Sequence, residues 1–169
     1  MYRAYHDEEW GTPLHGDDAL FERLCLEAFQ SGLSWITILR KRPAFRAAFA
    51  GFSIDAVAEF GPDDEAQLLA DAGIVRNRAK IAAAIGNARA AQRVPEGLSA
   101  LLWSFAPTGP RPRPATLADV PATSPESVAM ARELKRRGFV FVGPTTAYAL
   151  MQATGMVDDH VATCFRATA

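Results

Sequence analysis

The chain has 169 residues, of which 49% are hydrophobic and 22% are charged, and its formal net charge is −1. This ordinary globular composition excludes intrinsic disorder and collagen-like repeats, and the length indicates one domain spanning residues 1–169. Two cysteines, Cys25 and Cys164, do not indicate a secreted disulfide framework. No apolar run approaches the roughly 20 residues needed to span a bilayer, so we expect a soluble, cytoplasmic protein without membrane partners.

The 18 basic residues do not dominate the total charge, but they cluster along the chain. The clusters lie in residues 40–46, 76–80 and 135–137, and arginine outnumbers lysine in each. Arginine suits bidentate phosphate contacts. Solvated helix faces carry the same runs, however, so charge alone leaves nucleic-acid binding open.

Helical spacing of apolar residues extends over almost the whole chain. Asp17 and Asp18 are candidate N-caps of a first long helix, which should end near Gly32. A second helix is expected from Ser34 onward, interrupted or kinked at Pro43 because proline lacks a backbone N–H.

The remaining elements follow from the same signals. Helices are expected to start at Ser53 and Pro62, to run from Arg76 to Arg93 and from Ser124 to Arg137, and to finish with one from Pro144 or Thr145 to Ala153. The proline-rich residues 107–114 predict an irregular surface connection. Phe139–Val142 is strand-like, but one such run cannot form a sheet. The sequence therefore predicts an all-α bundle.

The segment between the last two expected helices, residues 138–146, is a short turn that we call the hairpin. Glycine allows the tight turn, and the backbone N–H groups at the following helix start can hold a phosphate. An ordinary corner between two helices also favours glycine and proline. Neighbouring basic and hydroxyl side chains favour a helix-hairpin-helix element that binds the DNA backbone. The candidate DNA-binding residues are Arg136, Arg137, Gly138, Gly143, Thr145 and Thr146.

One carboxylate, Glu27, lies inside an otherwise hydrophobic stretch. Its side chain is either turned to solvent or placed inside a pocket. Trp35 follows a glycine break, and Tyr5 and Trp10 add aromatic rings from another segment. A carboxylate surrounded by aromatic rings suits a flat ligand that is electron-poor or cationic.

A third group of residues has the chemistry of a metal site. His160 and Cys164 are four residues apart, so on a helical turn they would face the same way and share a tetrahedral zinc. His6, at the other end of the chain, is a further candidate ligand. Chance occurrence is the alternative for so few residues.

Four segments together resemble a known family, DNA-3-methyladenine glycosylase I, within the helix-hairpin-helix glycosylase superfamily. The resemblance runs in one register from Tyr2 to about Cys164. It implies hydrolysis of the N-glycosidic bond of 3-methyladenine in alkylated double-stranded DNA, with the base flipped into a pocket and an abasic site left behind. The segments are Tyr5–Gly11, Leu26–Trp35, Asp71–Ile81 and Arg137–Thr145.

The resemblance also implies roles for individual residues. Glu27 matches the carboxylate that hydrogen-bonds the excised base, and Tyr5 matches a pocket hydroxyl. Trp10 and Trp35 match pocket aromatics. The residues that match the loop filling the gap in the duplex are Gly32 and Leu33.

Asp158 is a second candidate catalytic acid. In the wider superfamily an aspartate shortly after the second helix of the hairpin supports the sugar cation and the attacking water, and Asp158 is the closest match by spacing. The glycosylase I family is described as working without that acid. A structural cap, or a contact that orients a zinc ligand, is therefore an equally open role for Asp158.

Family members carry a zinc clasp that ties the two ends of the chain together. His6, His160 and Cys164 match three of its ligands. The fourth ligand, a cysteine in an N-terminal Cys-x-Trp segment, has no counterpart, and we expect that segment to be missing from this chain. A site with one open position should bind zinc weakly, fill only partly or stay empty.

Two other functions are compatible with parts of the sequence. A DNA-binding module without catalysis would keep the hairpin, although the carboxylate and aromatic residues argue against it. A glycosylase for another damaged base, such as an oxidised purine or uracil, is the second. Lyase activity in such enzymes needs a lysine near the end of the hairpin, and no lysine follows Lys135. We therefore expect a glycosylase without lyase activity. We also expect the protein to be a monomer.

Overall fold

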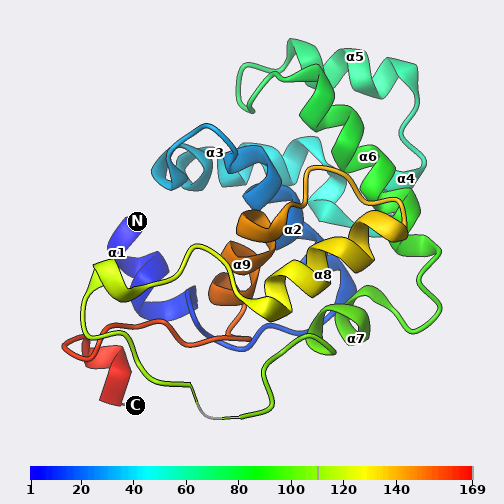
Figure 1. Cartoon of the computed structure of the whole chain (residues 1–169). Helices are drawn as coiled ribbons and strands as arrows, with labels where there is room; N and C mark the ends of the chain where they lie inside the picture. Colours follow the sequence, from blue (N-terminus) through cyan, green and yellow to red (C-terminus); the bar gives the residue numbers. More distant parts are fainter. Residues whose placement is uncertain (110, 169) are drawn as a thin grey trace.

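The computed structural model describes residues 1–109 and 111–168, and every regular element within these ranges is helical (Figure 1). The expected all-α class is therefore confirmed. Short turns of π- or 3₁₀-helix are η1 (Tyr5–Glu9), η2 (Ala50–Phe52), η3 (Leu117–Asp119) and η4 (Phe165–Thr168). The α-helices are α1 (Tyr2–Ala4), α2 (Asp17–Gln30), α3 (Trp35–Ala48), α4 (Ile54–Ala58), α5 (Pro62–Ala70), α6 (Arg78–Gln92), α7 (Leu98–Trp103), α8 (Pro125–Arg136) and α9 (Pro144–Ala153).

The central element is α2, which contacts α3, α4, α6, α7 and α9 (Figure 1). All residues from Leu20 to Phe29 are buried, as expected of a helix packed on every side. Three charged residues, Glu22, Arg23 and Glu27, are buried with them. Charged side chains are rarely buried without a structural or functional reason, so we expect these three residues to have such a role.

The expected N-caps of α2 are wrong in detail. Asp17 and Asp18 are its first two residues, and Gly16 is the N-cap. Asp17 accepts a hydrogen bond from the N–H of Ser99 (2.8 Å), and Asp18 accepts one from the N–H of Ile54 (2.9 Å). Because Ser99 and Ile54 lie at the starts of α7 and α4, these carboxylates satisfy the free N–H groups of neighbouring helices.

Other helix boundaries follow the local sequence. The second helix starts directly after Ser34, as expected, but it continues through Pro43 without interruption. Burial of Phe45 and Phe49 holds the segment after the proline against the core. Ser124 accepts a hydrogen bond from the N–H of Ser127 (3.2 Å) at the start of α8.

The strand-like run 139–142 forms no strand, and the described residues of 107–114 are irregular; Pro110 lies outside the described ranges. The chain after α9 turns back so that its segment lies on the same side of the molecule as the N-terminal segment (Figure 1), and Arg166 bonds the hydroxyl of Thr12 (2.9 Å). The N–H of Gly11 donates to the carbonyl of Gln152 (3.1 Å). Gly155 has a φ of +72°, and a Cβ there would lie 2.6 Å from the nitrogen of Pro13. Only glycine allows this approach.

The segment that carries His160 and Cys164 is not helical, so the helical turn expected for it is wrong. Instead, Asp158 accepts a hydrogen bond from the backbone N–H of His160 (3.1 Å). Gly155 has already turned the chain away from the axis of α9, and local side-chain bonds of this kind replace the helical ones. No helix in the described ranges has the length and apolar character of a membrane span.

Candidate active site

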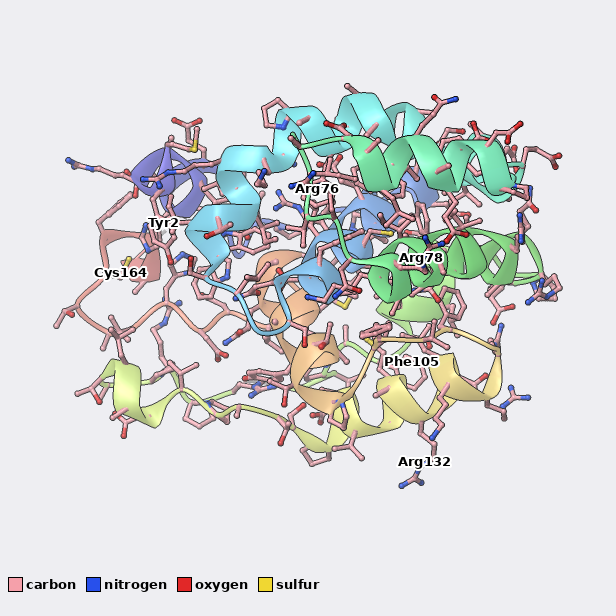
Figure 2. The ribbon with its side chains drawn as sticks, turned by 90° about the horizontal axis from the view of Figure 1, so that it is seen from above. Tyr2, Arg76, Arg78, Phe105, Arg132 and Cys164 are labelled. Atoms are coloured by element: carbon pink, nitrogen blue, oxygen red, sulfur yellow. The ribbon has the colours of Figure 1, made fainter. Side chains whose placement is uncertain are left out.

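A cavity of about 450 Å³ lies where η1, α2, α3, α9 and the segment after α9 meet. Tyr2 and Cys164, which both line it, mark this end of the molecule in Figure 2. Every residue expected to bind a base and every expected metal ligand lines this one cavity. These residues are Tyr5, Trp10, Glu27 and Trp35, together with His6, His160 and Cys164.

Glu27 places a carboxylate in the wall of the cavity. The residue is 6% exposed, and within the described chain its carboxylate has no hydrogen-bond partner. Burial raises the pKa of Glu27 to about 7, and the charge of Arg23 one helical turn earlier only partly opposes this. A ligand that offers hydrogen-bond donors or positive charge would satisfy this group.

Two aromatic side chains frame the carboxylate. The rings of Tyr5 and Trp35 lie 5.2 Å apart between centroids and are tilted by 45°. The indole Nε1 of Trp35 is buried and finds no acceptor among the described residues. Burial raises the pKa of Tyr5, so its phenol stays protonated and can donate. The cavity therefore combines apolar faces with hydrogen-bond donors and the unpartnered carboxylate of Glu27.

Trp10 has a second environment. Its ring stacks on His6 with centroids 6.2 Å apart, and its edge meets His160 with centroids 4.6 Å apart. Trp10 thus borders both the cavity and the two histidines of the expected metal site, which we call the metal cluster (His6, His160 and Cys164).

Sequence reasoning missed a charged network behind the cavity. The guanidinium of Arg23 lies 5.3 Å from the centroid of the Tyr5 ring and pairs with Glu9. Arg42 pairs with Glu9 (2.7 Å) and with Glu22 (2.6 Å). Part of the basic cluster in residues 40–46 is therefore used inside the protein. Only the unusual position of an arginine among the apolar residues of α2 could have indicated this.

His6, His160 and Cys164 bring three ligand atoms within 4.8 Å of one another. The Nδ1 of His6 lies 2.8 Å from a carboxylate oxygen of Asp7, and the Nδ1 of His160 lies 2.7 Å from one of Asp158. These contacts turn each Nε2 toward the cluster, as in many zinc sites, and the Nε2 of His6 lies 3.6 Å from the Sγ of Cys164. The Nε2 of His160 is buried and has no partner among the described residues. The donor set fits zinc.

Asp158 and Asp159 have different surroundings. The side chain of Asp158 is partly exposed, pairs with Arg113 (3.0 Å) and lies outside the cavity lining. Asp159 is buried and does line the cavity. It accepts hydrogen bonds from the hydroxyl of Tyr148 (2.6 Å) and the amide of Gln152 (2.8 Å). The sequence spacing could not separate these two neighbours.

The side chains expected to contact DNA from the hairpin are engaged with carboxylates. Arg136 and Arg137 both bond Glu133, at 2.7 Å and 2.6 Å, and Arg137 also bonds Glu96 at 2.8 Å. The hairpin backbone is more open. Its N–H groups without an acceptor in the described chain are those of Phe141, Val142, Gly143, Thr145 and Thr146.

The loop expected to enter the duplex projects beside the cavity wall. Gly32 has a φ of +79° and nothing near its Cβ position, and the side chain of Leu33 is 41% exposed. Lys80 donates hydrogen bonds to the carbonyls of Phe29 (2.9 Å) and Ser31 (2.5 Å). A basic residue predicted from a charge cluster thus fixes the start of this loop.

A helical fold whose open cavity combines a buried carboxylate with aromatic rings has the features of an enzyme that takes up a flat base. A family profile described as methyladenine glycosylase matches residues 1–167, and the chain belongs to this family. DNA-3-methyladenine glycosylase 1 of Escherichia coli (strain K12) is 46% identical over 97% of this chain and 90% of its own length. DNA-3-methyladenine glycosylase of Haemophilus influenzae is 42% identical over 97% of this chain and 91% of its own length.

Solved structures of family members agree with the fold. A crystal structure of 3-methyladenine DNA glycosylase I has a TM-score of 0.92 and 45% identity, covering 97% of this chain and 92% of that one. The enzyme from Staphylococcus aureus, studied for its recognition of 3-methyladenine, has a TM-score of 0.92 and 33% identity, covering 97% of this chain and 89% of that one.

Proposed function

We propose that this chain is a DNA repair enzyme that hydrolyses the N-glycosidic bond of 3-methyladenine in alkylated double-stranded DNA. The observation that carries the proposal is the buried, unpartnered carboxylate of Glu27 beside the rings of Tyr5 and Trp35 in one cavity. The activity named for relatives that match nearly the whole chain supports the same substrate.

The chemistry of the damaged base explains this pocket. Methylation at N3 gives the base a positive charge, so the base is an activated leaving group before the enzyme acts. When the C1′–N9 bond breaks, its electrons neutralise the base. Water forms the new bond to C1′ and releases a proton, which leaves an abasic site. The protein therefore needs mainly to flip the nucleotide out of the duplex and to recognise its base.

Recognition follows from the charges in the cavity. Glu27 accepts hydrogen bonds from the exocyclic amine of the base, and its ionised form favours a cation over neutral adenine. The indole rings of Trp35 and Trp10 provide aromatic surface against the flat base. The protonated hydroxyl of Tyr5 can donate a hydrogen bond to the base. Selection by charge separates the damaged base from the large excess of normal purines.

The hairpin and the loop before α3 would bind the duplex. The free N–H groups of the hairpin named above can hold a phosphate at the start of α9 in the manner of a helix-hairpin-helix element. Arg136 and Arg137 would exchange their carboxylate partners for phosphate. Gly32 and Leu33 would fill the gap that the flipped nucleotide leaves. Contacts of this kind position the enzyme without reading sequence.

We propose a structural zinc on His6, His160 and Cys164, which would link the two ends of the chain. Bound zinc supplies a crosslink here and takes no part in hydrolysis. Asp158 would orient His160 through its Nδ1, which favours a supporting role over direct catalysis. Three protein ligands should hold the ion less tightly than four.

Release of labelled 3-methyladenine from alkylated duplex DNA tests the function directly. Glu27→Gln should keep the fold and bind free 3-methyladenine at least about tenfold more weakly, because a charge-assisted hydrogen bond is lost. Quenching of tryptophan fluorescence measures this affinity. Gln30→Ala, which changes another residue of the cavity wall, provides a control for nonspecific effects.

The outcomes separate the alternatives. Binding of abasic duplex without release of any base would indicate a DNA-binding module. Release of an oxidised purine or uracil in preference to 3-methyladenine would indicate a glycosylase for another lesion. Unchanged affinity of Glu27→Gln for the free base would exclude Glu27 as the recognising group.

A further inference from the structure

A buried amide on α6 holds the hairpin by its backbone. Asn87 is 1% exposed, and its side chain bonds both backbone groups of Val140, 53 residues further along the chain. Its Nδ2 donates to the carbonyl of Val140 (3.0 Å), and its Oδ1 accepts from the N–H of Val140 (2.9 Å). The amide of Asn87 therefore pairs with Val140 as a neighbouring strand would.

This pairing meets a need of the strand-like run. Residues 139–142 are aromatic and β-branched, as is typical of a strand, but the described chain contains no sheet that they could join. The buried amide of Asn87 would cost free energy without partners, and its two bonds to Val140 satisfy it together with both backbone groups at the centre of this run. The bonded groups of Val140 consequently face α6, away from the open side of the hairpin.

The next residue carries backbone strain. Phe141 has a φ of +58°, a left-handed conformation that is unfavourable for a residue with a Cβ. Such conformations persist where neighbouring contacts over-determine them. The two hydrogen bonds of Asn87 fix the residue directly before Phe141. The free N–H groups of Val142 and Gly143 follow directly after it.

We propose that Asn87 is a positioning residue for DNA binding, which holds the hairpin in the strained turn that points its free N–H groups outward. This inference rests on the proposed function of the hairpin. Asn87 acts through Val140 and Phe141 and touches neither the base pocket nor DNA. Its loss lets the hairpin relax, so that phosphate binding weakens while base recognition at Glu27 is unchanged.

The test separates DNA binding from base recognition. Asn87→Ala should raise both the Kd for an abasic-site duplex and the KM for alkylated duplex at least about fivefold. The value of kcat at saturating DNA and the affinity for free 3-methyladenine should stay within about twofold. Gln92→Ala is the matched control, because this amide on α6 bonds Asp55 and does not reach the hairpin.

Salt dependence provides a second readout. Counterion release follows charged contacts, and Arg136 and Arg137 at the end of α8 lead directly into the hairpin. A relaxed hairpin also moves these charges away from phosphate, so the slope of log Kd against log salt should fall in Asn87→Ala. A purely structural loss of folded protein would lower the active fraction and leave this slope unchanged. If Asn87→Ala does not fold, Asn87→Ser, which keeps a small polar group, is measured in the same way.

Val140→Glu tests the hairpin itself, because it adds negative charge at an exposed position of the turn. If this variant weakens duplex binding and Asn87→Ala does not, the positioning role is wrong and the function of the hairpin stands. If neither variant weakens it, the hairpin does not bind DNA, and both proposals for it are overturned. Equal losses of free-base affinity and of duplex affinity in Asn87→Ala would also overturn the positioning role.

Discussion

The buried carboxylate of Glu27 has no hydrogen-bond or ion-pair partner within the described chain. Arg23 lies one turn earlier on α2, but its guanidinium pairs with Glu9 and lies over the ring of Tyr5. Burial therefore dominates and raises the pKa of Glu27 to about 7. A group in this state binds a cation well, because the cation supplies the charge that the protein withholds. When no base is bound, the buried charge of Glu27 lowers the stability of the folded protein.

This effect predicts a pH dependence of stability. The pKa of Glu27 rises from an ordinary value of 4.5 to about 7 on folding, so the unfolded chain loses its proton first. Stability then falls as the pH rises from about 4.5 to 7 and stays low above this range. Glu27→Gln removes the effect and should be more stable than the wild type at pH 8, by at most about 3 kcal/mol.

Urea unfolding at pH 5 and pH 8 measures the difference, which should shrink as the pH falls toward 4.5. Glu126→Gln is a control of opposite sign, because hydrogen bonding to Ser124 lowers the pKa of Glu126. An equal stability gain for Glu27→Gln at both pH values would contradict the raised pKa.

Helix ends explain much of the basic charge that the sequence left ambiguous. Lys80 bonds two carbonyls at the end of α2, and Lys41 bonds the carbonyls of Ala72 (2.9 Å) and Gly73 (3.0 Å) after α5. The carbonyl groups at a helix C-terminus carry partial negative charge and lack helical partners. These lysines therefore stabilise loops and are not free for phosphate.

Lys80→Met tests this role. Removing the ammonium leaves the carbonyls of Phe29 and Ser31 without their donor, and we expect a loss of about 1 kcal/mol in unfolding free energy. Release of 3-methyladenine from duplex should fall, while free-base binding is retained, because the loop that carries Leu33 loses its anchor. Lys135→Met, at an exposed position, is the stability control. No change in either urea midpoint or duplex activity for Lys80→Met would show that the anchor is dispensable.

Local sequence signals predicted the helix starts better than they predicted which groups the polar side chains contact. The starts of α5, α8 and α9 follow proline and capping residues, so the sequence alone placed them. Asp17 and Asp18 look like caps of their own helix, yet tertiary contacts bring other helix starts to their carboxylates. His160 and Cys164 have helical spacing, but the turn at Gly155 and the bonds of Asp158 keep that segment irregular.

The cavity is a property of the whole chain. Its residues come from both termini and from the central helix, and sequence spacing reached them only through the resemblance to a family. Arg23 and Asn87 were missed because each acts through a contact between separate segments: 14 residues for Arg23 with Glu9 and 53 for Asn87 with Val140. Side-chain type gives no sign of such contacts. Only the assembled fold identifies them.

The metal cluster also depends on the whole molecule, because a bound ion would join η1 to the segment after α9. An ion that binds the folded chain and not the unfolded one stabilises it by an amount that grows with its free concentration, about 2.7 kcal/mol at 100 times the Kd. Adding Zn²⁺ to chelator-treated protein should therefore raise the Tm, and chelator should reverse the change.

His6→Ala should abolish this rise in Tm, because two remaining ligands cannot hold the two ends together. His15→Ala is the matched control and should keep the response, since His15 stacks on Trp103 outside the cluster. Mg²⁺ should have no effect, because a thiolate and two imidazoles do not suit a cation that prefers oxygen ligands. A Tm that does not respond to Zn²⁺ in the wild type would remove the proposed link between the ends. The contacts of Gly11 with Gln152 would then have to hold the N-terminal segment without an ion.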